Sequence, residues 1–161
     1  MNAGSRSASL LRRLLEKEVA AMESMIRTLE EEARALLSHT AEQLERATKT
    51  KNAHFDTLKQ LEAEREALFD ALQLKGDNRQ ILLMLERDFD DARLGKLWQQ
   101  LLSLGQECRE LNRLNGMTIE LGYHHVSQAL QLVSGRPGTP ESYGPRGKKH
   151  EGGASRLLGQ A

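Results

Sequence analysis

Apolar residues in the first forty positions recur at alternating steps of four and three, the spacing of one face of a long helix. From Leu15 onward this apolar seam continues for three heptads, which is a coiled-coil pattern. Its members are Leu15, Val19, Met22, Ile26, Leu29, Ala33 and Leu36. We therefore predict a helix over about residues 7–37, and a helix of that length needs a second helix beside it to cover the seam.

A second, less regular seam follows a short turn at Ser38-His39 and predicts a helix over about residues 40–75. Thr40 and Gln43 have the spacing of a capping box, and Gly76 marks the end of the helix. The seam consists of Leu44, Ala47, Lys51, His54 or Phe55, Leu58, Leu61, Arg65, Leu68 and Leu72. Because the turn is short, we expect the first two helices to be antiparallel.

Two more helices follow, a short one over about residues 78–86 and a long one over about residues 90–133. Asp77 and Gln80 repeat the capping-box spacing immediately before the short helix. The long helix opens with an apolar seam formed by Leu94, Leu97, Leu101, Leu104, Cys108 and Leu111. This seam predicts that the beginning of the long helix packs against the first two helices.

The seam of the long helix turns polar after Leu111, because Asn115, Thr118 and Gly122 come next in its register. A shift of one residue recovers an apolar stripe that is rotated relative to the first seam. This stripe consists of Ile119, Tyr123, Val126, Leu130 and Val133. We therefore expect the last segment to face something other than the first two helices. Whether the helix breaks at Asn115-Gly116, where helix propensity is low, is left open.

Composition supports an all-α fold, because Ala, Glu, Lys, Leu and Arg supply about half of the 161 residues. All three prolines and seven of the thirteen glycines follow residue 134. We therefore predict an elongated antiparallel helical bundle, or coiled-coil hairpin of long helices, over residues 1–134. Residues 135–161 are predicted to be a flexible, disordered tail, because they contain too little apolar material to offset the entropy of ordering.

The charge balance and the few residues that could carry chemistry argue against several classes of function. Residues 1–134 carry 18 basic and 21 acidic side chains, which argues against nucleic acid as the partner. No apolar run approaches a membrane span and no signal segment opens the chain, so we expect a cytoplasmic protein without membrane insertion. Cys108 lies in an apolar seam, and the adjacent His124 and His125 cannot share a metal ion. We predict no enzyme activity, metal or cofactor.

Residues 109–122, RELNRLNGMTIELG, resemble the Leu-Asn-x-x-Asn-Gly signature in the last helix of the FlgN family of flagellar export chaperones. Three further features are similar to that family. They are the two long N-terminal helices, the KLWQQLLSL segment around Trp98, and the Tyr143-Gly144 step in the tail. The resemblance covers roughly residues 10–147 and departs from the family in adding Leu157-Leu158, whose role is left open.

The resemblance implies a cytoplasmic chaperone of the hook-filament junction (hook-associated) proteins. Such a chaperone binds the C-terminal helical segments of these proteins, prevents their premature assembly and delivers them to the flagellar type III export apparatus. It implies export-gate docking by Tyr143 and Gly144. The cargo-binding residues that it implies are Asn112, Asn115, Ile119, Tyr123, Val126, Leu130 and Val133.

The alternative from a different class is a structural coiled-coil scaffold, or oligomerisation protein, that carries no cargo. Both alternatives use the same apolar seams, which can close within one chain or between copies. The sequence therefore leaves the oligomeric state open.

Overall fold

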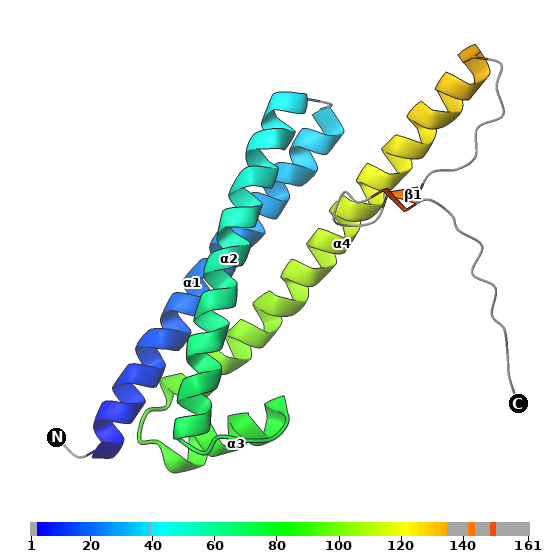
Figure 1. The fold of residues 1–161 in the computed structure, drawn as a ribbon. Coiled ribbons are helices and arrows are strands. Elements are labelled where there is room, and N and C mark those ends of the chain that lie inside the picture. Colours follow the sequence, from blue (N-terminus) through cyan, green and yellow to red (C-terminus); the bar gives the residue numbers. More distant parts are fainter. Residues whose placement is uncertain (1–2, 39, 135–141, 144–148, 151–161) are drawn as a thin grey trace, which may run out of the picture. The chain divides into compact units, whose positions relative to one another are not determined.

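The computed structural model describes residues 3–38, 40–134, 142–143 and 149–150, and the described chain is almost entirely helical (Figure 1). The elements are α1 (Ala3–Ser38), α2 (Ala41–Ala71), α3 (Asn78–Asp88), α4 (Arg93–Ser134), β1 (Ser142–Tyr143) and β2 (Lys149–His150). The all-α prediction is confirmed. Its internal contacts divide the chain into two units within α4, between Glu120 and Leu121. We call the part up to Glu120 the bundle unit and the part from Leu121 the C-terminal unit.

Helices α1 and α2 form an antiparallel hairpin, in which they lie side by side (Figure 1). Two ion pairs between the helices fix the register. Arg65 of α2 bonds Glu18 of α1 at 2.7 Å, and Lys51 of α2 bonds Glu32 of α1 at 2.6 Å. The two pairs are 14 residues apart on each helix, or two heptads, so both lie on the same face of the hairpin.

Within the bundle unit, α4 lies against α1 and runs in the same direction. Near the start of α1, Arg12 bonds Asp91, which precedes α4, at 2.9 Å. Near the end of α1, Glu32 accepts a hydrogen bond from Asn115 of α4, also at 2.9 Å. Helix α4 continues through Asn115 and Gly116, so the helix does not break at that step. The bundle unit is thus a three-helix bundle to which the short α3 is added.

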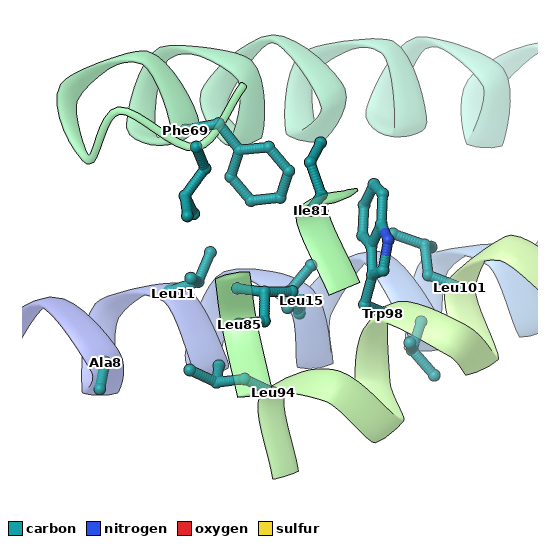
Figure 2. Close-up of a cluster of buried hydrophobic side chains, with 11 residues drawn as sticks. Ala8, Leu11, Leu15, Phe69, Ile81, Leu85, Leu94, Trp98 and Leu101 are labelled. Atoms are coloured by element: carbon teal, nitrogen blue, oxygen red, sulfur yellow. The ribbon is translucent and has the colours of Figure 1, made fainter. Parts of the chain in front are cut away.

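The apolar core lies where the beginning of α1, the end of α2, helix α3 and the beginning of α4 meet (Figure 2). Its buried members are Ala8, Leu11, Leu15, Val19, Phe69, Leu74, Ile81, Leu85, Leu94, Trp98 and Leu101. The rings of Phe69 and Trp98 are tilted at 58° with centroids 5.4 Å apart, and the Trp98 indole donates to the carbonyl of Asn78 at 3.1 Å. These contacts anchor α4 to both α2 and α3.

The helix ends differ from the prediction in three places. Helix α1 begins at Ala3, before the expected start, and α2 ends at Ala71 rather than near residue 75. The early end of α2 follows from Gln73, which adopts the left-handed conformation with a φ of 59°. The capping box predicted at Thr40 and Gln43 is wrong, because the Thr40 side chain makes no capping hydrogen bond.

The capping box predicted before α3 is confirmed. The Asp77 carboxylate accepts from the Gln80 amide at 2.8 Å, and the Gln80 side chain accepts from the Asp77 amide at 2.8 Å. Gly76, just before this box, has a φ of 127°, a backbone conformation that side-chain-bearing residues rarely adopt. The turn between α2 and α3 therefore requires glycine at this position.

The C-terminal unit contains the end of α4 and a two-stranded antiparallel ladder. Strand β1 pairs with β2 so that Ser142 lies opposite His150 and Tyr143 lies opposite Lys149. Gly144, the Leu157-Leu158 pair and most of the expected tail lie outside the described residues.

Candidate functional site

Asn115 of α4 is buried, with 4 % of its surface exposed. It continues the register of Leu104, Cys108 and Leu111, and so faces α1 as the seam of α4 requires. Its Nδ2 atom donates to the backbone carbonyl of Leu29 at 2.8 Å and to Oε2 of Glu32 at 2.9 Å. The signature asparagine therefore has an internal partner in this conformation of the chain.

Glu32 is fully buried, and its carboxylate accepts hydrogen bonds from two side chains. Lys51 of α2 donates to Oε1 at 2.6 Å, while Asn115 donates to Oε2. A buried carboxylate is costly unless it is paired and hydrogen-bonded, and both conditions hold here. Glu32, Lys51 and Asn115 thus connect α1, α2 and α4, and we call these three residues the polar cluster.

The other two predicted residues of the bundle unit, Asn112 and Ile119, lie on the exposed side of α4. Leu114 and Met117, to which the sequence pattern assigned no role, are also exposed and project from another face of the helix. Arg113 lies between Glu110, with which it pairs at 2.7 Å, and the sulfur of Met117, at 2.9 Å. The face that carries Leu114 and Met117 therefore presents apolar side chains next to a charged pair.

In the C-terminal unit, the four remaining stripe residues are also exposed. They are Tyr123, Val126, Leu130 and Val133, and the exposed fraction reaches 63 % for Leu130 and 88 % for Val133. The Tyr123 ring meets the His124 ring edge-on, with centroids 6.5 Å apart. Exposed apolar side chains at helical spacing are the arrangement by which one helix binds another amphipathic helix.

Two further apolar residues of the C-terminal unit are exposed but do not belong to the predicted stripe. They are Leu121 and Leu132. A single heptad register excludes them, because they lie on other faces of the helix. The sequence could have indicated these two residues, because residues 119–133 contain more apolar side chains than one stripe requires. The end of α4 is therefore apolar on more than one face.

The candidate chemistry of the described residues concerns the Cys108 thiol and the side chains that could bind a metal ion. Burial raises the pKa of the Cys108 thiol, as the seam position predicted, and this suppresses the reactive thiolate. Across residues 3–38 and 40–134 and the two short strands, no three His, Cys, Asp or Glu side chains are placed to hold a metal ion. None of the helices that the structure describes carries an apolar stretch sufficient to cross a bilayer.

The model of the FlgN protein family matches residues 1–151, nearly the whole chain. No curated protein and no solved structure matches it. The matched region includes all four helices and the Leu-Asn-x-x-Asn-Gly segment of α4. The chain therefore belongs to the FlgN family, whose members are flagellar export chaperones.

Proposed function

We propose that this protein is the cytoplasmic chaperone of the hook-filament junction proteins and binds their C-terminal helical segments through the end of α4. The observation that carries the proposal is the exposure of apolar side chains along α4 in a chain of this family. The proposed contacts are Asn112, Ile119, Tyr123, Val126, Leu130 and Val133. Asn115 joins them only when it leaves Glu32.

Elementary energetics make this surface suitable for reversible cargo binding. Burying one valine or leucine side chain contributes about 1.5–3 kcal/mol, so a few of them suffice for a specific complex. Ordering of a helical cargo segment opposes binding and keeps the net affinity moderate. A chaperone of this kind prevents premature assembly by covering the cargo helices, and it releases them at the export apparatus without a cofactor.

Delivery to the export apparatus is assigned to Tyr143 and Gly144. The support is the family resemblance together with the position of Tyr143 after α4, in a short ladder of its own. Substituting Tyr143→Ala should impair delivery and leave cargo affinity unchanged, because the proposed cargo contacts lie on α4. A loss of cargo affinity in this variant would contradict the division of roles.

The decisive experiment is calorimetric titration of the full chain with the C-terminal helical segment of a junction protein from the same organism. We expect Leu130→Ser to weaken binding at least tenfold, because the side chain is lost from the interface. The matched control is Leu83→Ser on α3, a comparably exposed leucine outside the proposed surface. Equal affinities for the two variants would overturn the proposed site.

The scaffold alternative has its own readout. Exposed apolar residues on α4 could instead bind a second copy of the chain, and self-association would then bury them. Sedimentation of the free protein distinguishes the two functions. A stable oligomer that dissociates on Leu130→Ser and takes up no junction-protein segment would favour the scaffold.

A further inference from the structure

The polar cluster holds a part of α4 that has no other buried contact. Of residues 112–120, all of which the structure describes, only Asn115 is buried. Leu114, Met117 and Ile119 are exposed, and a side-chain carbon placed on Gly116 would meet no atom within 4 Å. In this stretch, the contact between α4 and the hairpin therefore rests on hydrogen bonds rather than on apolar packing.

In the polar cluster, each carboxylate oxygen of Glu32 has its own hydrogen-bond donor. Both carboxylate oxygens of Glu32 are engaged, one by Lys51 and the other by Asn115. The Asn115 amide group also bonds the Leu29 carbonyl, which lies one turn before Glu32 on α1. Loss of Asn115 from this position leaves one oxygen of a buried carboxylate without its donor.

The physical nature of this contact makes it selective and easy to reverse. Separating packed apolar surfaces exposes them to water, which is costly in proportion to the area exposed. Separating hydrogen-bonded groups exchanges protein partners for water, so the net stabilisation per bond is small. Buried polar groups instead specify one arrangement, as a single buried asparagine does in coiled coils.

We propose that Asn115, Glu32 and Lys51 form a latch that holds residues 112–120 of α4 on the α1–α2 hairpin. The latch opens while the apolar core around Trp98 stays folded. Its opening frees Asn115 and separates residues 112–120 from the hairpin. The latch follows from contacts within the bundle unit alone, and only its use during cargo binding rests on the proposed function.

Amide hydrogen exchange on the full chain tests the latch. Asn115→Asp places a second carboxylate beside Glu32, and like charges at this distance repel each other. We expect the amides of residues 112–120 to exchange at least tenfold faster, while those around Trp98 stay protected. The matched control is Asn112→Asp, the same substitution three residues away on the exposed side of α4, which should leave exchange unchanged.

A swap variant distinguishes loss of the latch from general misfolding. Combining Asn115→Asp with Glu32→Gln exchanges the carboxylate and the carboxamide between the two positions, so that a single negative charge remains and the new amide at position 32 can donate to the new carboxylate at position 115. We expect the swap to restore most of the protection of residues 112–120. Unchanged exchange in Asn115→Asp, equal acceleration throughout the bundle, or failure of the swap to restore protection would each overturn the latch.

Titration of Asn115→Asp and the wild type with the junction-protein segment separates the latch from the proposed function. If the closed latch opposes cargo binding, Asn115→Asp binds several-fold more tightly than the wild type, because more of the protein is already open. Equal affinities of Asn115→Asp and the wild type would overturn the use of the latch in cargo binding. Absence of binding by both proteins would instead overturn the proposed function, and the exchange result would still decide the latch.

Discussion

Arg65 donates a hydrogen bond to Glu18 at 2.7 Å in the α1–α2 contact, where both side chains are largely withdrawn from water. The guanidinium also lies 5.5 Å from the ring centroid of Trp98 and 5.9 Å from that of Phe69. A planar cation can bond a carboxylate and contact aromatic rings at the same time, which an ammonium group does less well. Arg65 thus joins the hairpin to the apolar core.

Removing Arg65 should destabilise the protein strongly. Above pH 7, where Glu18 is ionised, Arg65→Met leaves this carboxylate buried without its counter-charge, and breaking a buried pair in this way costs about 3–5 kcal/mol. The double variant Glu18→Met/Arg65→Met should recover most of this loss, because no uncompensated charge remains. Urea unfolding followed by circular dichroism measures both changes.

The control for Arg65 is Arg46→Met on the same helix. Arg46 pairs with Glu42 at 3.3 Å, but both side chains are exposed, and such pairs contribute about 0–1 kcal/mol. A similar destabilisation by Arg46→Met and Arg65→Met would show that burial of the pair is not the source of the effect.

Glu18 should make stability depend on pH in the direction opposite to that of most carboxylates. Burial, opposed by Arg65 and reinforced by Glu62, raises the pKa of Glu18 to about 7 from its ordinary value of 4.5. Between these two values the folded protein retains a proton that the unfolded chain releases. The contribution of Glu18 to stability is therefore full below pH 4.5 and is lost as pH rises towards 7, with a slope of up to about 1.4 kcal/mol per pH unit.

Urea unfolding at a series of pH values isolates this contribution when wild type is compared with Glu18→Gln. The difference in stability between the two proteins should change across the window, because the glutamine does not titrate. Glu30→Gln, at an exposed position of the same helix, is the control and should leave the pH profile unchanged. A constant offset between wild type and Glu18→Gln would contradict the raised pKa.

The seam of α2 could be predicted from the sequence, but its partners on α1 could not. In α2 the predicted seam is the less exposed side, with His54 rather than Phe55 facing inward. Helix α1 buries two adjacent stripes, because α2 and α4 both pack on it. The second stripe contains Glu18 and Glu32, whose acidic side chains suggested solvent exposure. Only the register of the hairpin reveals that each faces a cation.

The candidate site was predictable to a similar extent. The sequence indicated that the seam of α4 turns polar at Asn115 and that an exposed apolar stripe follows, since both follow from helical periodicity. The partner of Asn115 was not predictable, because Glu32 is 83 residues away in the chain. Pattern analysis assigns a face to each residue, whereas pairing across helices requires the three-dimensional register.

The core offers a matched pair of leucines on α3. Leu85 is fully buried, so Leu85→Ala should cost about 2–5 kcal/mol through lost burial and the cavity that remains. Leu83, two residues away, is 55 % exposed, and Leu83→Ala should stay within about 0.5 kcal/mol of wild type. Thermal unfolding of both variants checks the prediction. Equal unfolding midpoints would show that Leu85 does not belong to the core.

The two capping-box sequences provide the last test, because they share a spacing and differ in structure. Asp77 makes its capping bond at 2.8 Å, so Asp77→Ala should cost about 1 kcal/mol. Thr40 occupies the equivalent position of α2 without a capping bond, so Thr40→Ala should cost less than about 0.5 kcal/mol. Urea unfolding of the two variants measures the difference. Equal losses would mean that Thr40 caps α2 in solution, and that the spacing alone had been sufficient to predict it.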